Sequence, residues 1–496
     1  RPPRSTLFPY TTLFRSVASI ATIPFSNTTT TSMNQDLIFD AELIQRYDTA
    51  GPRYTSYPTA VQFTDQFGEA QYREALARSQ TQAHVTGGAI SLYFHIPFCD
   101  TVCYYCACNK IVTKDRSRSE PYLTLLEKEM DLVAREVSKD RIVDQLHWGG
   151  GTPTFLNHAE MTRLMDSTHR HFTLRDDDTG EYSIEIDPRE ADAAGIKLLR
   201  QLGFNRISLG VQDFDPAVQK AVNRIQSAEE TFAVLDAARA EGFHSVSMDL
   251  IYGLPLQTVD SFLKTLDRVL ETRPNRLSMF NYAHLPTRFK PQRRINEADM
   301  PAPAQKLAIL QASIEHLTAA GYVFIGMDHF ALPNDSLAVA QRLGSLHRNF
   351  QGYTTHAECD LLAFGVSSIS QVAGCTSQNV KEMEPYAAAL NEGRLPIERG
   401  LCMTRDDEIR RAVIMQLICQ FSLDYAQFSL EHGINFSDYF AESLPRLQPM
   451  IADGLIEMDN HHIRVLPRGR LLIRNVCMPF DGYLGGDKAQ RFSKVI

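Results

Sequence analysis

Short apolar runs rich in β-branched and aromatic residues alternate with longer stretches of helical periodicity between residues 91 and 283. Six runs predict strands: SLYFHIPF from Ser91, QLHWGG from Gln145, YSIEID from Tyr182, RISLGVQ from Arg206, SVSMDLIYG from Ser245 and RLSMFNYA from Arg276. Helical patterns lie between them at residues 122–137, 159–172, 191–202, 228–241 and 261–272. This alternation is typical of βα units around a parallel sheet, so we expect an α/β fold with a partial (β/α)6 barrel.

The regions on either side of the barrel, residues 91–300, have different patterns. Residues 33–90 predict an N-terminal arm, with the Pro- and Gly-containing segment GPRYTSYPTA from Gly51 and a helix over residues 69–78. Residues 301–400 predict a barrel extension with the substrate-pocket region, and residues 401–496 a mainly helical C-terminal domain. Residues 1–32 contain no Asp or Glu and precede Met33, which indicates a non-native or disordered leader or, alternatively, a transit peptide.

Composition narrows the class of protein. The net charge of -9 argues against general nucleic-acid binding, which depends on basic surface. No apolar run approaches the roughly 18 residues of a membrane span, so we expect a soluble, cytoplasmic protein. Nine cysteines are too unevenly placed for a disulfide scaffold, and five scattered ones are expected to be buried or inert thiols: Cys359, Cys375, Cys402, Cys419 and Cys477.

Three of the other cysteines, Cys99, Cys103 and Cys106, form a CxxxCxxC loop after the first predicted strand. Such a loop can bind three irons of a 4Fe-4S cube and leave the fourth without a protein ligand. That iron can bind S-adenosylmethionine (SAM), which an electron from the cluster then cleaves to a carbon radical. A structural zinc site is the alternative, but four thiols within ten residues suit tetrahedral zinc poorly. Cys108 lies outside the three-ligand pattern and is given a possible accessory catalytic role.

Polar and glycine residues recur at the predicted carboxyl ends of the strands, where side chains from separate loops converge in parallel α/β folds. The run GGGTP from Gly149 follows the second strand and allows close approach of the backbone to a ligand. Further along the chain, Glu185, Gln212, Arg224 and Asp249 offer partners for the ammonium, carboxylate and ribose groups of SAM. We therefore expect one polar site at the barrel mouth.

At SLYFHIPFCDTVCYYCACNK the chain resembles the family of oxygen-independent coproporphyrinogen III oxidases. The resemblance covers essentially everything after about Asp36, and it continues through GPRYTSYPTA, LHWGGGTPT, IEIDPRE, GVQDF, DLIYGLP, FNYAHLP, GMDHFA, HRNFQGYTT and RGRLLIRN. It implies that Cys99, Cys103 and Cys106 bind one [4Fe-4S] cluster. It also implies two SAM molecules, the first contacted by Tyr93, Tyr105, Gly150 and Glu185, and the second by Gly151, Thr152, Gln212, Arg224, Asp249, Ala283 and Ile369.

The implied reaction converts two propionates of coproporphyrinogen III to vinyl groups, giving protoporphyrinogen IX in haem biosynthesis. A 5'-deoxyadenosyl radical would remove a propionate β-hydrogen before carbon dioxide and one electron are lost. The expected partners are coproporphyrinogen III and a low-potential electron donor such as flavodoxin or ferredoxin, and the protein is expected to be a monomer. Because four propionates make the substrate anionic, Arg53 and Arg348 are candidate substrate contacts, with Asp328 and His329 as further pocket residues.

Two other functions fit parts of the pattern. A haem chaperone on the same scaffold would bind haem without decarboxylating a substrate. Cys108 and the arm segment from Gly51 favour the oxidase, because the resemblance includes both. An iron-sulfur electron carrier would have no use for an open iron, a glycine loop and a barrel with a polar mouth.

Overall fold

The computed structural model describes residues 37–484, apart from residue 87 and residues 357–358. Contacts divide the chain into two units, Arg1–Met33 and Asn34–Ile496, and all described residues belong to the second. The predicted leader, residues 1–32, lies outside the described residues.

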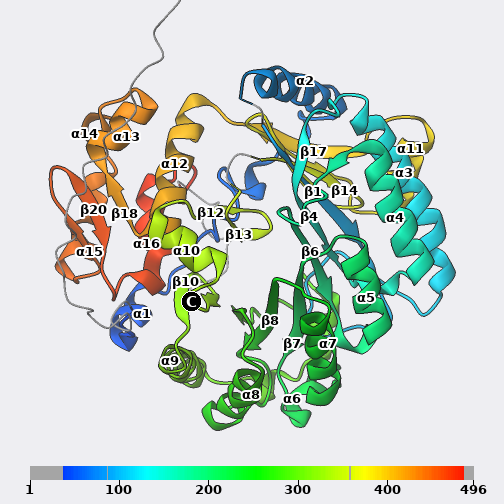
Figure 1. The fold of residues 1–496 in the computed structure, drawn as a ribbon. Helices are drawn as coiled ribbons and strands as arrows, with labels where there is room; N and C mark the ends of the chain where they lie inside the picture. Colours follow the sequence, from blue (N-terminus) through cyan, green and yellow to red (C-terminus); the bar gives the residue numbers. More distant parts are fainter. Residues whose placement is uncertain (1–36, 87, 357–358, 485–496) are drawn as a thin grey trace, which may run out of the picture. The chain divides into compact units, whose positions relative to one another are not determined.

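The six predicted βα units are confirmed by six adjacent parallel strands (Figure 1). In sheet order they are β9 (Arg276–Asn281), β8 (Ser245–Tyr252), β7 (Arg206–Gln212), β6 (Glu181–Ile186), β4 (Ile142–Gly150) and β1 (Ile90–Ile96). The helices of these units lie along one face of the sheet: α3 (Ser119–Ala134), α4 (His158–His171), α5 (Ala193–Gln201), α6 (Pro216–Ala221), α7 (Ala228–Ala240), α8 (Val259–Thr272) and α9 (Pro303–Ala319).

Local sequence signals fix where these helices begin. Asn157 caps α4 and Ser227 caps α7, and in both cases a glutamate three residues later returns a hydrogen bond to the cap backbone. Such capping boxes satisfy amide groups that a helix end leaves without partners. These two caps therefore determine the residues at which α4 and α7 begin, and so where the preceding loops end.

The two faces of the strands differ in polarity. Along β6 and β7, buried residues alternate with half-buried ones, and the buried set packs under the helices. The opposite face carries polar side chains around a cavity of about 210 Å³, including Ser183, Glu185, Ser208, Ser247 and Asp249. The period of two along a strand thus separates an apolar core from a polar interior.

The sheet continues past both edges of the barrel. β14 (Asp360–Phe364) pairs parallel with β1, and β15 (Ile369–Val372), β16 (Cys375–Asn379) and β17 (Ile397–Cys402) follow antiparallel. At the other edge, β11 (His329–Ala331) pairs with β9 and with β10 (Val323–Gly326). Smaller pieces of this region are α10 (Ser336–Leu343), β12 (His347–Asn349), β13 (Gly352–Thr354) and α11 (Met383–Asn391).

One expectation about the cysteines is wrong. Cys375 and Cys402 face each other across β16 and β17 and form a disulfide. They are 27 residues apart in the sequence, and only the pairing of the two strands brings them together. Cys359, Cys419 and Cys477 are not in disulfides, and the last two are buried.

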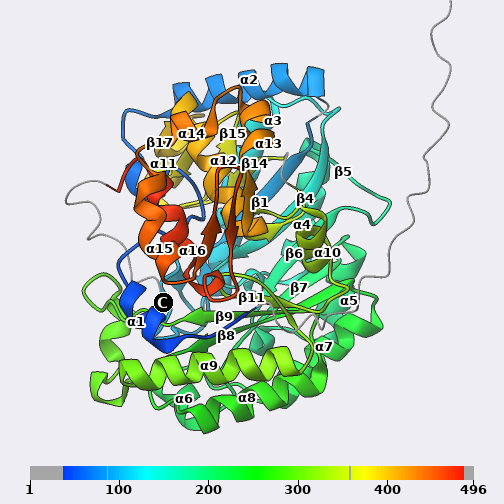
Figure 2. The ribbon, with the colours of Figure 1, turned by 90° about the vertical axis from the view of Figure 1, so that its left-hand side faces the viewer.

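The C-terminal region is mainly helical, as predicted. It contains α12 (Arg405–Gln420), α13 (Tyr425–His432), α14 (Phe436–Tyr439), α15 (Gln448–Ala452) and α16 (Ile473–Cys477), with a small sheet of β18 (Ser422–Asp424), β20 (His462–Val465) and β19 (Ile456–Met458). The arm contributes α1 (Ala41–Tyr47), which lies beside this region (Figure 2), and α2 (Glu69–Thr86), which is longer than the predicted helix. No helix in the described part of the chain is long and apolar enough to cross a membrane.

Candidate radical and substrate site

The cysteine loop leaves the barrel directly after β1. Cys99 ends the short strand β2 (Phe98–Cys99), which pairs with β3 (Ile111–Val112) and closes the loop at its base. Within the loop, the Cys106 amide donates to the Cys103 carbonyl over 3.2 Å. Cys103 is buried, Cys99 and Cys106 are half-buried and Cys108 is exposed. Three thiols therefore lie on one tight turn with access from the barrel mouth.

The surroundings of these sulfurs suit thiolate ligands. Arg224 Nη1 lies 3.6 Å and Arg189 Nη2 3.9 Å from Cys103 Sγ, and Thr152 Oγ1 lies 3.5 Å from Cys99 Sγ. Burial raises the pKa of Cys99 to about 11, and binding of a metal ion would lower it again. Hydrogen-bond donors near the sulfurs of an iron-sulfur cluster commonly adjust its reduction potential.

The spacing of the thiols also bears on the zinc alternative. Tetrahedral zinc would hold its sulfur ligands roughly 3.8 Å apart. Among the described residues, one trio of potential ligands has its donor atoms within 4.8 Å of one another, and it lies outside this loop. Among the described residues, the three loop sulfurs are therefore not all within 4.8 Å of one another, which is wider than tetrahedral zinc would hold them.

The glycines at the carboxyl end of β4 permit close packing against the end of β1. A Cβ on Gly150 would lie 2.6 Å from the His95 ring, and one on Gly151 would lie 2.7 Å from the Phe98 carbonyl oxygen. Gly150 also has a φ of 112°, a conformation that favours glycine. The Gly151 and Thr152 amides donate to the Ile96 and Phe98 carbonyls over 2.8 Å. In this structure the close approach is therefore to the end of β1 and the start of β2, which holds the glycine run beside the cysteine loop.

Glu185 lies on β6 facing the same loop. Its Oε2 accepts a hydrogen bond of 3.2 Å from the Gly150 amide, and its Oε1 lies 3.3 Å from His147 Nε2. Burial alone would raise the pKa of Glu185, but these partners outweigh it and lower the pKa below its usual value. Tyr93 stacks on His147, with 5.8 Å between ring centroids. The carboxylate is thus ionised and suited to a substrate ammonium group.

Gln212, Arg224 and Asp249 converge on one point of the sheet. A Cβ on Gly210 would lie 3.1 Å from both the Gln212 and the Arg224 side chains, and Gly210 pairs with Asp249 across β7 and β8. Arg224 also forms a 2.9 Å ion pair with Asp187. Burial raises the pKa of Asp249 to about 6, and Ser208 donates to this carboxyl over 3.0 Å. Gln212 and Asp249 lie on β7 and β8, the next strands from Glu185 on β6, and Arg224 follows α6.

Ala283 and Ile369, the last two predicted SAM contacts, lie on different parts of the sheet. Ala283 follows β9, whereas Ile369 begins β15 on the far side of β1. Ala283 is connected to the cysteine loop through Gln292, whose Nε2 donates to the carbonyls of Tyr105 and Ala283 over 3.1 and 3.2 Å. Gln292 is almost fully buried.

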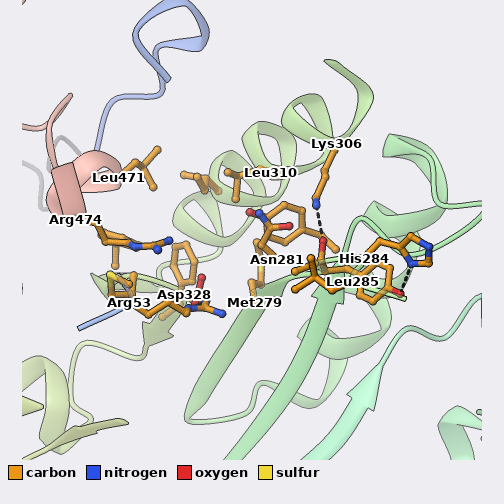
Figure 3. Close-up of a pocket in the computed structure, with 17 residues that line it drawn as sticks. Arg53, Met279, Asn281, His284, Leu285, Lys306, Leu310, Asp328, Leu471 and Arg474 are labelled. Carbon is orange, nitrogen blue, oxygen red and sulfur yellow. Dashed lines mark hydrogen bonds and ion pairs between the residues drawn. The ribbon is translucent and has the colours of Figure 1, made fainter. Parts of the chain in front are cut away.

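The four substrate candidates separate into two pairs. Arg53 and Asp328 form an ion pair at a cavity of about 290 Å³ (Figure 3). His329 instead lines the cavity on the polar face of the sheet and packs against Tyr353, over which the buried Arg348 lies at 5.0 Å. Burial and the charge of Arg348 lower the pKa of His329 to about 4, so this imidazole is neutral.

Comparison with known proteins decides which family the chain belongs to. Residues 93–269 match the model of the radical SAM superfamily, and residues 403–472 match the HemN C-terminal domain. The oxygen-independent coproporphyrinogen III oxidase of Pseudomonas aeruginosa is 56% identical over 92% of this chain and 99% of its own length. The oxygen-independent coproporphyrinogen III oxidase of Escherichia coli is 52% identical over 93% of this chain and 99% of its own length. The solved structure of the Escherichia coli enzyme, described as a radical SAM enzyme, has a TM-score of 0.85 and covers 91% of this chain.

The chain belongs to the family of oxygen-independent coproporphyrinogen III oxidases. The predicted resemblance and the radical SAM fold are therefore confirmed. Membership in this coproporphyrinogen III oxidase family implies an iron-sulfur cluster and SAM. The domain boundaries and the roles of individual residues remain predictions.

Two residues that contact these sites were not predicted from the sequence. Arg474, in the segment RGRLLIRN, lines the cavity of Arg53 and donates to the carbonyls of Gly51 and Pro52. Burial and the charge of Arg53 lower the pKa of Arg474 to about 10. The second residue is Gln292, whose side-chain amide bridges two loops. No pattern in the sequence indicates such a bridge. The resemblance covered the Arg474 segment but gave no contact for it.

Proposed function

We propose that this chain carries out the anaerobic oxidative decarboxylation of coproporphyrinogen III to protoporphyrinogen IX. The observation that supports this most strongly is the 56% identity with a named enzyme over almost its whole length. The position of Cys99, Cys103 and Cys106 at the mouth of a partial barrel agrees with it. Each propionate would lose carbon dioxide, one hydrogen atom and one electron to become a vinyl group.

The cysteine loop would hold a [4Fe-4S] cluster, which together with SAM supplies a 5'-deoxyadenosyl radical when both are bound. The chain's own residues would bind and orient the reactants. Glu185 would accept the SAM ammonium group and Asp249 a ribose hydroxyl, while Arg224 would face a carboxylate. His147 holds Glu185 in its ionised form. Cys108, two residues from a cluster ligand, is proposed to have an accessory catalytic role.

Two SAM molecules per chain are proposed because the polar groups form two neighbouring sets. Glu185, Tyr93 and Gly150 lie around His147 and β1. Gln212, Arg224 and Asp249 gather around Gly210 on the next strands. We further propose a monomer that takes its electrons from a flavodoxin or ferredoxin.

The cavity of about 290 Å³ is proposed to receive a propionate-bearing edge of the substrate (Figure 3). It is smaller than a tetrapyrrole, so most of the ring would lie outside it. Arg53, Lys306 and Arg474 are three cations among its lining residues, against one carboxylate, Asp328. An excess of positive charge in a half-enclosed space favours an anionic group. Arg53 would exchange its partner Asp328 for a propionate.

An anaerobic assay tests the proposed function. The reconstituted protein is given a low-potential reductant, SAM and coproporphyrinogen III, and the products are separated by mass spectrometry. We expect protoporphyrinogen IX, carbon dioxide and 5'-deoxyadenosine, the last in a ratio of one per vinyl group. Protein that retains its cluster but forms none of these products would refute the proposal, and a stable haem complex without turnover would favour a haem chaperone.

Asp249 gives SAM binding a predicted pH dependence. The carboxyl is ionised above its pKa of about 6 and accepts a ribose hydroxyl in that form. As the pH falls below 6, the dissociation constant of one SAM should rise by about tenfold per pH unit. In Asp249→Asn this rise should disappear and binding should be weak at every pH. Anaerobic equilibrium dialysis between pH 5 and 8 measures the dissociation constant of SAM.

The exposed Asp236 of α7 provides the matched control for this measurement. Asp236→Asn should keep the pH dependence of the wild-type protein. If Asp249→Asn keeps it as well, Asp249 is not the titrating group.

Arg53→Gln is expected to raise the KM for coproporphyrinogen III by roughly tenfold, because a charge-assisted hydrogen bond to a propionate is lost. The Arg53 side chain is 41% exposed, so its removal should leave the fold intact. Asp328→Asn is the matched control, since it removes the competing carboxylate and should not raise the KM. Equal KM values for Arg53→Gln and the wild-type protein would exclude Arg53 from substrate binding.

A further inference from the structure

Asp144, His356 and Cys359 meet at the amino-terminal edge of the parallel sheet, away from the cysteine loop. Asp144 is near the start of β4, six residues before Gly150 at its carboxyl end, which is about 20 Å along a strand. The other two residues come from the connection between β13 and β14. Two segments that are distant in sequence therefore bring three potential metal ligands together.

An irregularity in the sheet places Asp144. Ile90 of β1 pairs with Val143, but Ser91 pairs with Gln145, so Asp144 is the extra residue of a β-bulge. A bulge changes the direction of a side chain and is a common feature of functional sites. Cys359 immediately precedes β14, which pairs with the other side of β1. Asp144 and Cys359 are thus placed on either side of one central strand.

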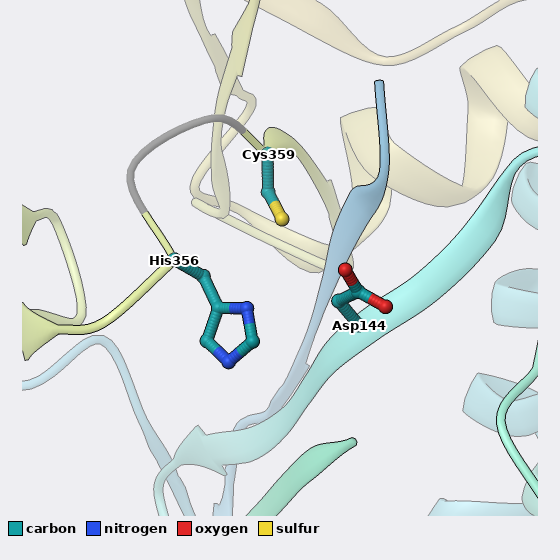
Figure 4. Close-up of side chains that lie close together, drawn as sticks. All are labelled: Asp144, His356 and Cys359. Carbon is teal, nitrogen blue, oxygen red and sulfur yellow. The ribbon is translucent and has the colours of Figure 1, made fainter. Parts of the chain in front are cut away.

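The three donor atoms lie within 4.8 Å of one another and all three residues are half-buried. Figure 4 shows the Cys359 thiol, the Asp144 carboxylate and one ring nitrogen of His356 around a common space. Thiolate, imidazole and carboxylate are the ligand types of zinc sites, whose ligand distances are about 2.0–2.3 Å. Side-chain movements of about 1 Å would bring these atoms to the spacing of a tetrahedral ion.

One neighbouring carboxylate supports a metal ion at this place, and one arginine competes with it for Asp144. Glu181 Oε2 lies 3.9 Å from His356 Nε2. Coordination through Nδ1 would leave Nε2 directed at Glu181, the pairing with a carboxylate that orients most histidine ligands. Arg175 Nε lies 2.5 Å from Asp144 Oδ1, and the second carboxylate oxygen can still bind a metal. A cavity of about 160 Å³, lined in part by His356 and Cys359, has room for a water as fourth ligand.

We propose that Asp144, His356 and Cys359 bind one divalent metal ion of the zinc class, separate from the iron-sulfur cluster. Bound there, the ion would join His356 and Cys359 to Asp144 of β4. This connection follows β13, whose Tyr353 packs on His329. The proposal does not depend on the reaction that the chain catalyses.

The test uses cluster-reconstituted protein treated with EDTA, given one equivalent of Zn²⁺ and passed through a desalting column. We expect about one zinc per chain by elemental analysis, in addition to the iron. The zinc X-ray absorption spectrum should show one sulfur at about 2.3 Å and three nitrogen or oxygen ligands at about 2.0 Å. A spectrum dominated by several sulfurs would place the ion in the cysteine loop and overturn the proposal.

Substitutions locate the ion. The double variant His356→Gln and Cys359→Ser should lose the zinc but keep its iron, whereas His461→Gln, at an exposed histidine of the C-terminal region, should keep both. Zinc retained by the double variant at the wild-type level would refute the site. Should the double variant not fold, Asp144→Asn and the spectrum of the wild-type protein give the same decision.

Discussion

Cys103→Ser is expected to abolish formation of 5'-deoxyadenosine and to reduce bound iron and sulfide to background. Cys103 is the buried member of the three-thiol loop, and two arginines lie near its sulfur. Serine oxygen is a poor replacement for a cluster thiolate, and two remaining cysteines do not hold a cube. Iron and sulfide analysis after anaerobic reconstitution, together with the absorbance of the cluster, measures the effect.

Cys108→Ser is the informative control for this experiment, because Cys108 lies in the same loop but outside the three-ligand set. It should retain the iron of the wild-type protein while turnover decreases. Full iron content and wild-type 5'-deoxyadenosine formation in Cys103→Ser would contradict the assignment of ligands. Loss of iron in Cys108→Ser would show a fourth protein ligand and leave no open iron.

Arg224→Met is expected to lower thermal stability and to stop turnover. Arg224 is buried, and it forms a 2.9 Å ion pair with Asp187 besides its contact with Cys103. Removing one partner of a buried ion pair costs about 3 kcal/mol when the other charge is left unpaired, so this figure is an upper limit here. Asp187 keeps Arg189 at 2.6 Å, which should preserve the fold. Thermal unfolding of the reconstituted protein measures the loss.

A second measurement separates the cluster contact from the general loss of stability. Without the Arg224 donor near Cys103 Sγ, the reduction potential of the cluster should become more negative. Arg224→Lys, which keeps the charge, should shift the potential less than Arg224→Met. Arg268→Met, at a half-buried arginine of α8 away from the cysteine loop, should leave the potential unchanged. Wild-type stability and potential in Arg224→Met would contradict this account.

The alternation of strands and helices was predictable from the sequence, because the periodicity of apolar residues that indicates each element is local. The strands at Arg206 and Ser245 were predicted within one residue of their observed bounds, since their side chains alternate between a core and a polar interior. The cysteine loop was equally visible, because its ligands lie within eight residues. Side chains at the ends of neighbouring parallel strands then had to meet at one edge of the sheet.

The remaining features depend on contacts between distant segments. The disulfide between Cys375 and Cys402 needs the register of β16 and β17, and the sequence does not state this register. The role of Arg474 depends on an arm more than 400 positions earlier in the chain. The close contacts of the glycine run with His95, Pro97 and Phe98 likewise depend on the pairing of β4 with β1.

Gln292 joins the cysteine loop to the end of β9 through a side-chain amide. An amide carries no net charge and does not titrate, so this connection should have the same strength at every pH and salt concentration. The connection between Tyr105 and Ala283 through Gln292 is then expected to persist in experiments that vary pH or salt. A change of rate with pH can be assigned to ionisable groups such as Asp249, and a change with ionic strength to charged contacts such as Arg53.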